Sequence, residues 1–534
     1  MSNSFYAKLF AKRSFVSFFM VMLLLLTCIL RVAVVATKDD YKQIQANQSA
    51  YKIEVARPRG TIYDCNMVPI TNSKTKTIAA VLPTPRAITA ISKYIDVNGV
   101  DALKNNMPAI CEVPKKISAQ GVSTTLVYEH ISSDMPACHI IGYTDNTGHG
   151  ISGLERAYDN LLYNEKTINA IFTTDGKGNS LCGIEPYFEN AMSSVNNGVV
   201  TTLDINIQNI TEKSVSKLNS GCAIVSEVQT GKIRALASVP TFNANSIYNS
   251  LNKSNSPMLN RAISLYSVGS VFKPCVAAIA IENGYANRIF NCKGNLEIEK
   301  RKFKCHKLTG HGDIDLCNSL AQSCNCYFYD TALSLGAEKV YKIAAHLSIG
   351  AKIKIADNFY TTSGNVPTLN KLNTKSTLAN LSIGQGSLMC SPIAMLNLYT
   401  AIAGDGSYYL PSVVEKTIKD GAYNIYDIGY KTKVMEATTA KQLREFLKTV
   451  ITDGTGTDAK PTLCTAAGKT ATAQTGRYYE DGSEITNSWF CGFFPADEPM
   501  YAVVVMSDSQ SEVSTASVFA EIADGITEFK TNNT

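Results

Sequence analysis

Several signals that mark other protein classes are missing from this sequence. The net charge is only +5 over 534 residues, which gives no indication of nucleic-acid binding. There is no sustained internal repeat and no low-complexity tract, which argues against solenoids and disordered tails. The fifteen cysteines include no Cys-x-x-Cys pair, the spacing typical of many zinc and redox sites. The composition that remains, 45% hydrophobic and 18% charged, is that of a globular protein with ample core.

The cysteines do not form the framework of a small disulfide-rich protein, because the chain is large and their number is odd. Some stand in apolar runs and are expected to be small core residues: Cys222, Cys275 and Cys491. Cys292 and Cys305 flank a polar loop over 293–304 and are the best candidates for a disulfide. His306 and His311 lie nearby, so a metal site is the alternative there. Without Cys-x-x-Cys spacing that alternative is weak, and we predict no metal and no cofactor.

The one long apolar run lies at the N-terminus. Residues 14–36 are long enough to span a bilayer, with Arg31 reaching toward the outer edge. Basic residues precede the run, which predicts a single-pass protein with a cytoplasmic N-terminus and the remaining chain outside: Lys8, Lys12 and Arg13. The alternative is a signal peptide cleaved near Ala36, which the length of the run disfavours. Either interpretation exports the bulk of the protein.

Residues 37–197 predict a structural module. Helices are expected over 87–94 and 153–162, and strands over 164–183. No cluster of His, Asp and Glu at ligand or catalytic spacing occurs in this part of the sequence. We therefore expect three regions: a cytoplasmic tail and membrane anchor over 1–36, this module over 37–197, and a larger domain over 198–534.

The larger domain is expected to have an α+β fold. Asp204 can cap a helix at its start. Strand hairpins are expected near both ends of the domain, over 222–238 and 488–507, and an extended run over 466–475. Helices are expected over 267–403, 438–451 and 513–529. Strands at both ends with helices inserted between them predict one antiparallel sheet covered by helices.

The stretch around Ser270 and Lys273 carries the clearest chemical signal. It precedes an apolar run over 275–281, which predicts a helix whose first turn holds both residues. Three residues apart, their side chains share one face of that helix. A hydroxyl beside an amine is a nucleophile beside a base, and the free N–H groups of a helix N-terminus favour developing negative charge. Since Ser-x-x-Lys is common by chance, the accompanying motifs decide its meaning.

Two further motifs follow in a fixed order. Ser323-Cys324-Asn325 begins 53 residues beyond Ser270, and Lys469-Thr470-Ala471-Thr472 opens the extended run. Ser-x-x-Lys, Ser-x-Asn and Lys-Thr-small-Thr in this order are typical of penicillin-binding proteins and class A β-lactamases, which use a serine nucleophile.

The chain resembles the class B penicillin-binding proteins, which are cell-wall D,D-transpeptidases, in register from Arg57 to the C-terminus. Outside the three motifs, the blocks that carry the resemblance are 57–64, 153–155 with Tyr158, Asp159 and Leu162, 260–262, 382–386 with Ser391, Pro392 and Met395, and 489–493. The resemblance implies an elongated mixed pedestal domain of the dimerisation type over 37–197. It also implies a penicillin-binding transpeptidase domain over 198–534, with an antiparallel sheet of about five strands, similar to serine β-lactamases.

The resemblance also implies catalytic roles. Ser270 would attack the carbonyl between two D-alanines of a peptidoglycan stem peptide. Lys273, kept neutral by burial and by the charge of Lys469, would accept its proton. Ser323 would pass a proton toward the leaving amine, and Asn325 would orient Lys273 and the substrate amide. An amine from a neighbouring strand would then complete the cross-link.

The third motif is implied to supply the catalytic residue Lys469, which would receive the terminal carboxylate of the substrate together with Thr470 and Thr472. Ala471 is implied to be a substrate-binding residue with them. The backbone N–H groups of Ser270 and Thr472 would form the oxyanion hole. Ala471 departs from the pattern, because the family usually has glycine there. Strand alternation places Thr470 and Thr472 on one face and Lys469 and Ala471 on the other, so the added methyl could crowd the floor of the site. Alanine is the mildest replacement, and activity is expected to survive, with altered β-lactam affinity.

Class B proteins lack a glycosyltransferase domain, and 37–197 leaves no room for one. The implied partners are therefore stem peptides, β-lactam antibiotics and a SEDS-type glycan polymerase in the membrane. Three alternatives stay open: a secreted β-lactamase, which needs a deacylating base; a membrane-bound β-lactam sensor, which needs an effector domain; and an inactive scaffold of the cell-wall machinery, suggested only by Ala471.

Overall fold

The computed structural model describes residues 2–37, 49–190, 195–426, 429–509 and 511–533. The chain divides into two compact units. The first comprises Met1–Pro58, Thr75–Tyr128 and Glu165–Ser193, and the second comprises Arg59–Lys74, Glu129–Asn164 and Ser194–Thr534. The second unit thus takes in three segments of the predicted module, 59–74, 129–164 and 194–197. The predicted domain boundaries at 36 and 197 stay predictions.

Helix α1 spans Ser2–Thr37. Its stretch Phe5–Ala36 is long and apolar enough to cross a membrane, since 32 residues exceed the roughly 20 that a bilayer requires. The apolar segment expected over 14–36 is therefore one continuous helix.

The first unit carries two small sheets. In one, β6 (Ile168–Thr173) lies between β1 (Ala50–Ala56) and β7 (Tyr187–Glu189). In the other, β3 (Lys74–Val81) lies between β4 (Ala109–Val113) and β5 (Val122–Glu129). Helices α3 (Pro85–Ile91) and α4 (Val97–Lys104) bury Ile91 and Leu103 in a common core with this sheet. The side chains of Thr84 and Asp96 cap the two helices, which explains where they begin.

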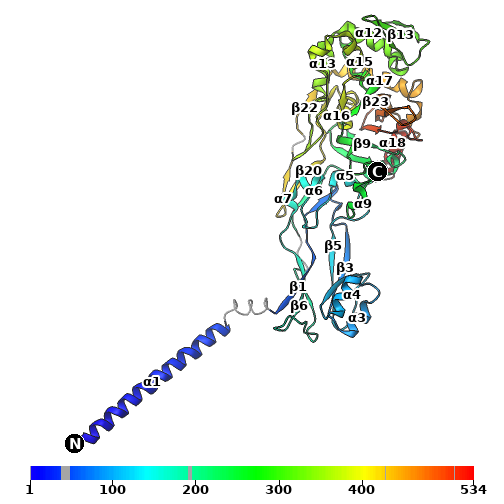
Figure 1. The fold of residues 1–534 in the computed structure, drawn as a ribbon. Coiled ribbons are helices and arrows are strands. Elements are labelled where there is room, and N and C mark those ends of the chain that lie inside the picture. Colours follow the sequence, from blue (N-terminus) through cyan, green and yellow to red (C-terminus); the bar gives the residue numbers. More distant parts are fainter. Residues whose placement is uncertain (1, 38–48, 191–194, 427–428, 510, 534) are drawn as a thin grey trace. The chain divides into compact units, whose positions relative to one another are not determined.

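The second unit is built on a five-stranded antiparallel sheet with the order β10-β9-β25-β24-β23. Figure 1 labels two of its strands, β9 and β23. The strands are β9 (Gly221–Glu227), β10 (Ile233–Val239), β23 (Ala467–Tyr478), β24 (Glu484–Phe494) and β25 (Tyr501–Ser507). The C-terminal hairpin thus pairs with the hairpin that opens the unit, so the predicted α+β class and the sheet of about five strands are confirmed.

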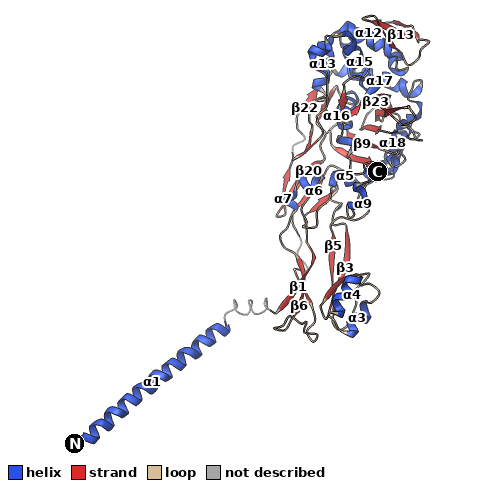
Figure 2. Ribbon diagram, in the orientation of Figure 1, coloured by secondary structure: helices blue, strands red, loops and turns tan. Residues whose placement is uncertain are grey.

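Helices cover both faces of this sheet (Figure 2). Val503 and Val505 of β25 lie in one core cluster, which includes residues of α8 (Ile205–Val215) and α18 (Thr515–Asn532). Val504 and Met506 lie in the other, which includes α16 (Pro392–Ala403). Alternate residues of β25 belong to different core clusters because successive side chains of a strand point to opposite faces of the sheet. Ala471, one of the predicted site residues, belongs to the cluster that includes α16.

The prediction of a polar loop over 293–304 is wrong in one respect, because these residues form two strands. Strand β12 (Phe290–Cys292) pairs with β15 (Gly312–Ile314), and β13 (Asn295–Ile298) pairs with β14 (Arg301–Lys304). Leu296 and Phe303 face each other across the second hairpin and pack on the core of the unit, while charged residues alternate with them. Three apolar side chains among many charges were too weak a pattern to predict these strands.

The remaining elements of the second unit complete its layers. The helices are α5 (Cys138–Ile141), α6 (Gly153–Ala157), α7 (Asp159–Leu162), α9 (Tyr248–Leu251), α10 (Lys273–Glu282), α11 (Leu316–Ala321), α12 (Asn325–Leu335), α13 (Ala337–His346), α14 (Leu369–Leu372), α15 (Lys375–Ser382) and α17 (Ala437–Thr452), with 3-10 turns η1 (Arg261–Ile263), η2 (Gly269–Phe272) and η3 (Thr457–Ala459). The short strands are β2 (Thr61–Tyr63), β8 (Gly198–Thr201), β11 (Tyr266–Ser267), β16 (Lys354–Ala356), β17 (Phe359–Tyr360), β18 (Met389–Cys390), β19 (Ser407–Tyr409), β20 (Val414–Lys419), β21 (Ala422–Ile425) and β22 (Lys431–Lys433).

Candidate active site

Ser270 lies in the 3-10 turn η2, which leads directly into α10. The predicted helix therefore begins at Lys273, three residues later than Ser270, and Pro274 fits its first turn because that N–H has no helical partner. Gly269 has a φ of +69°, which favours glycine, and its N–H donates to the carbonyl of Gly384 at 2.8 Å. The turn is sharp because glycine permits it.

Side chains from the surrounding elements hold this turn in place. The hydroxyl of Tyr399, on α16, donates to the carbonyl of Val271 at 3.0 Å. The indole N–H of Trp489, on β24, donates to the carbonyl of Ser267 at 2.9 Å. Both aromatic side chains are fully buried. Two of the blocks that carry the family resemblance, those around Gly384 and Trp489, thus position the backbone beside Ser270.

The amine of Lys273 is wholly buried and makes three hydrogen bonds. It donates to the carbonyl of Ser323 at 2.7 Å, to Oγ of Ser323 at 3.0 Å and to Oδ1 of Asn325 at 2.7 Å. Burial lowers the pKa of Lys273 to about 7, while nearby cysteines oppose that shift. The share expected from the charge of Lys469 stays a prediction, because the repulsion between the two amines is recorded at Lys469, whose pKa the charge of Lys273 lowers.

Ser323 and Asn325 reach Lys273 because of the break between α11 and α12. Ser323 has a φ of +54°, in the left-handed region that serine rarely adopts. This conformation lets both its carbonyl and its hydroxyl contact the same amine. Asn325 is the first residue of α12. The second motif therefore forms the short connection between two helices, and two of its residues accept hydrogen bonds from the amine of Lys273.

The third motif lies on β23, the edge strand of the described sheet. Lys469 and Ala471 are buried, whereas Thr470 and Thr472 are more exposed, as strand alternation predicts. The amine of Lys469 donates to the carbonyl of Thr470 at 3.1 Å and to Oγ1 of Thr455 at 3.4 Å. Burial, and then the charge of Lys273, hold the pKa of Lys469 well below its usual range.

A cavity of about 610 Å³ brings the three motifs together. The predicted residues that line it are Ser270, Ser323, Asn325, Thr470, Ala471 and Thr472. Lys273 and Lys469 lie buried behind its wall. Within the described residues, Ser270 makes no hydrogen bond to Lys273, whose amine is taken up by Ser323 and Asn325. The site thus combines a hydroxyl, an amine that can exchange a proton near neutral pH and an open strand edge.

Other residues of the cavity were missed by the sequence analysis. They are His306, Thr455, Asp458, Ser488, Trp489 and the run Ser507, Ser509, Ser511, Glu512, Val513, Ser514, Thr515 and Ala516. The serine-rich composition just before the last helix could have marked that run as a polar loop. Nothing local marks Thr455, whose Oγ1 lies 2.9 Å from Oγ1 of Thr470, because its contact depends on the fold.

All fifteen cysteines have free thiols in the structure, so the disulfide expected between Cys292 and Cys305 is not formed. Their sulfur atoms nevertheless lie within 4.8 Å of each other, in a cluster with Cys324 and His311. The disulfide prediction is therefore wrong, although the two thiols do lie close together; the nearby position of Cys324, 19 positions beyond Cys305, could not be predicted from the sequence.

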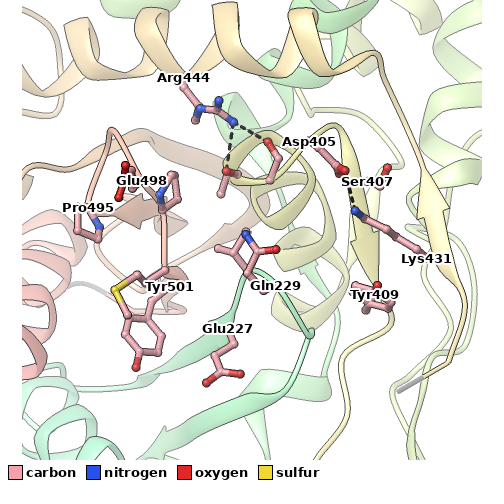
Figure 3. A pocket seen from close by; sticks show the side chains of 15 residues that line it. Glu227, Gln229, Asp405, Ser407, Tyr409, Lys431, Arg444, Pro495, Glu498 and Tyr501 are labelled. Carbon is pink, nitrogen blue, oxygen red and sulfur yellow. Dashed lines mark hydrogen bonds and ion pairs between the residues drawn. The ribbon is translucent and has the colours of Figure 1, made fainter. Parts of the chain in front are cut away.

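A second cavity of about 760 Å³ lies elsewhere in the same unit (Figure 3). Two of its charged side chains have these partners: Lys431 lies 2.6 Å from Asp405, and Arg444 donates to the carbonyl of Gly404 at 2.5 Å. None of the predicted site residues lines it. It is the larger cavity, but it lacks a nucleophile beside a base.

Comparisons with known proteins agree with this geometry. Residues 221–528, more than half of the chain, match the family described as "Penicillin binding protein transpeptidase domain". Stage V sporulation protein D of Bacillus subtilis is 28% identical over 394 residues, which cover 70% of this chain and 58% of that protein. Peptidoglycan D,D-transpeptidase MrdA of Acinetobacter baumannii is 24% identical over 471 residues, which cover 78% of this chain and 68% of that protein. The match thus spans less than two thirds of the sporulation protein.

Solved structures share the fold. Penicillin binding protein 3 from Mycobacterium tuberculosis, complexed with aztreonam, superposes with a TM-score of 0.66 at 23% identity, over 90% of this chain and 97% of that one. The D,D-transpeptidase domain of a peptidoglycan glycosyltransferase from Eggerthella lenta gives 0.65 at 22% identity, over 90% and 99%. The fold and the family match lead to one conclusion: the chain belongs to the penicillin-binding protein transpeptidase family, as a class B penicillin-binding protein.

Proposed function

We propose that this chain is a peptidoglycan D,D-transpeptidase that works through an acyl-enzyme on Ser270. One observation carries the proposal: the amine of Lys273 is fully buried, has a pKa near 7 and is hydrogen-bonded to Ser323 and Asn325, three residues after a serine that lines the cavity. MrdA of Acinetobacter baumannii, a relative, is itself named a peptidoglycan D,D-transpeptidase.

Acylation would begin with attack by the Ser270 hydroxyl on the carbonyl between two D-alanines. The proton of that hydroxyl passes to neutral Lys273, which burial makes available near pH 7. Ser323 then relays a proton to the leaving D-alanine amine, since its hydroxyl lies 3.0 Å from Lys273 Nζ. Asn325 fixes the direction of the amine through its side-chain oxygen.

Substrate would bind along β23. Thr470 and Thr472 face the cavity and can receive the terminal carboxylate, with the amine of Lys469 behind them. An extended peptide can lie along the edge of this strand. The N–H groups of Ser270 and Thr472 are the proposed oxyanion donors, each worth about 10²–10³ in rate. An amine from a second stem peptide then attacks the acyl-enzyme, which forms the cross-link and frees Ser270.

We further propose that α1 anchors the protein in the membrane, with its N-terminus in the cytoplasm and the catalytic unit outside. The apolar length of Phe5–Ala36 supports an anchor, and Lys8, Lys12 and Arg13 support the orientation. The three predicted regions, 1–36, 37–197 and 198–534, are kept as proposed domains. A SEDS-type glycan polymerase is the proposed membrane partner, and co-purification of the full chain with such a polymerase tests it.

The intact mass of the full chain after mixing with penicillin tests the activity. The chain is purified in detergent, and Ser270→Ala is the control. A stable adduct on the wild type alone supports an acyl-enzyme on Ser270. The same adduct on Ser270→Ala would contradict that assignment.

The lifetime of the adduct separates the alternatives. Persistence for many minutes supports a transpeptidase, whereas rapid loss supports a β-lactamase. Two carboxylates among the cavity residues, Asp458 and Glu512, are the groups to replace in that case. If no adduct forms at any concentration, the chain is a scaffold and the proposed activity is wrong.

A further inference from the structure

Four potential metal ligands meet beside the catalytic cavity. The sulfur atoms of Cys292, Cys305 and Cys324 and a ring nitrogen of His311 all lie within 4.8 Å of one another. Cys305 Sγ lies 4.0 Å from Cys324 Sγ and 3.7 Å from Nδ1 of His311. In a tetrahedral zinc site with Zn–S of about 2.3 Å and Zn–N of about 2.0 Å, the same separations are about 3.8 Å and about 3.5 Å. We infer that these four residues form a structural zinc site.

The backbone around the cluster brings the ligands together. Cys292 ends β12, and its carbonyl accepts a hydrogen bond from the N–H of His311 at 3.0 Å. The N–H of Cys305 donates to the carbonyl of Gly294 at 2.8 Å. Gly310 has a φ of +82°, and a Cβ there would lie 2.9 Å from the nitrogen of Gly294. The loop therefore returns tightly enough to place His311 opposite Cys305.

The chemistry of the set fits zinc. Structural zinc sites are closed by four protein ligands, with Cys₃His among the common sets. The three cysteines are almost fully buried and His311 is half-buried, so the ligands point inward. Binding converts three thiols to thiolates and releases their protons to solvent, with no change of oxidation state. A disulfide would need two sulfurs at about 2.05 Å and would leave the third thiol and the imidazole without a role.

Cys324 links this site to the catalytic residues. It stands between Ser323 and Asn325, which both contact the amine of Lys273. The left-handed backbone of Ser323 persists only if its surroundings hold it. Zinc bound to Cys324 would fix this connection from behind, while the hairpins that carry the other ligands lie against α12 (Figure 1). This consequence rests on the proposed function, whereas the metal site does not.

The zinc content of the full chain, purified in detergent without chelators, tests the site. Elemental analysis should find about one zinc per chain. Cys305→Ala should lower the retained zinc by about tenfold or more, since even weaker perturbations around zinc cost 10–100-fold in affinity. Cys317→Ala is the matched control, because Cys317 lies on α11 outside the cluster. His311→Cys keeps four ligands and should keep the zinc.

Several results would overturn the site. The first is a wild type that contains no zinc. The second is an equal zinc content in Cys305→Ala and Cys317→Ala. The third is a wild type in which alkylation labels two thiols fewer than expected because Cys305 and Cys324 form a disulfide. If Cys305→Ala does not fold, cobalt loading of the metal-stripped wild type decides the question. A tetrahedral cobalt spectrum with thiolate charge-transfer absorption supports the site, and its absence overturns it.

The link to catalysis has its own readout. Removing zinc from the wild type should slow acylation by penicillin about tenfold or more, and returning zinc should restore the rate. An unchanged rate would overturn the positioning role of Cys324 and leave the metal site intact. No acylation with zinc bound would contradict the proposed function, not the metal site.

Discussion

In the described part of the second unit, two groups of buried ionisable side chains differ in their partners: one group has oppositely charged partners, and the other has only uncharged ones. Arg59 and Glu155 form an ion pair at 2.6 Å with both side chains almost fully buried, and Asp159 lies 2.8 Å from the same guanidinium. The imidazole of His130 lies 2.8 Å from Glu155. Lys273 and Lys469 are equally buried, yet no carboxylate among the described residues contacts either amine; their partners are carbonyl, hydroxyl and amide oxygens.

The consequence is seen in the pKa values. Burial by itself would raise the pKa of Glu155, but His130 and Arg59 outweigh it and hold the pKa below its usual value. No carboxylate offsets the burial of Lys273, and its pKa falls to about 7. A buried charge with its partner holds the structure, whereas a buried amine without one can exchange a proton at neutral pH. Cavity volume makes no such distinction, since the larger cavity contains Lys431, whose amine lies 2.6 Å from the carboxylate of Asp405.

Replacing Lys273 with methionine should give the largest effect, and on activity. Acylation by penicillin should fall by about 10²–10⁴, because the proton acceptor is lost. The free energy of unfolding should change by no more than about 1–3 kcal/mol, since methionine removes the cost of burying the amine but leaves the oxygens of Ser323 and Asn325 without their donor. Stopped-flow acylation and urea unfolding measure the two quantities. If Lys273→Met were strongly destabilised but acylated at the normal rate, Lys273 would serve stability and not catalysis, which contradicts this prediction.

Glu155→Ala should act in the opposite way, on stability. Removing one partner of a buried ion pair leaves Arg59 short of its partner and should lower the free energy of unfolding by about 3–5 kcal/mol. Asp134→Ala is the control, because its pair with Lys74 is exposed and should cost less than about 1 kcal/mol.

The pH dependence adds a sign to that prediction. Since the folded pKa of Glu155 is lowered, its contribution is present above the ordinary pKa of 4.5 and is lost as the pH falls through the folded value. Acid unfolding of Glu155→Ala should therefore begin from a lower stability but with a shallower pH slope. Equal slopes for the two proteins would show that the pair is not coupled to folding.

The sequence predicted the two groups unequally, for physical reasons. The three catalytic motifs could be placed because each is local: a helix start, a helix connection and a strand. The pairing of Arg59 with Glu155 could not, because 96 residues separate them. The same holds for Cys324 beside Cys305 and for Thr455 beside Thr470, which meet only when the sheet and its helices assemble. Strand alternation predicted which face of β23 carries Lys469. Nothing in the local sequence predicts that no described carboxylate contacts the amine of Lys273.

The pH profile of acylation should sharpen the comparison further. With a pKa of about 7 for Lys273, the acylation rate should rise about tenfold per pH unit below 7 and level off above it. Stability should change in the same direction: between about 7 and 10.5 the unfolded chain holds a proton that the folded chain lacks, so the free energy of unfolding rises with pH. Lys273→Met should remove its share of that slope and leave the share of Lys469, whose folded pKa is also lowered. An acylation midpoint near 10.5 would mean that the buried amine is not perturbed.

The smallest effect is expected at Ala471, on the same face of β23 as Lys469. A Cβ at Gly269 would lie only 3.3 Å from the Cβ of Ala471, so the missing side chain of Gly269 provides the space for this methyl. Ala471→Gly should lower the free energy of unfolding by about 1 kcal/mol, through the lost buried methyl and the added backbone freedom. Acylation should change by less than about tenfold, because the methyl packs against the turn instead of blocking the cavity. Gly269→Ala is the informative counterpart, since it adds a methyl at a φ of +69° and should slow acylation more. If Ala471→Gly instead raised the acylation rate more than tenfold, the methyl of Ala471 would be restricting β23, which carries the proposed oxyanion donor of Thr472. The buried amines of Lys273 and Lys469 would then not be the only feature that sets the rate.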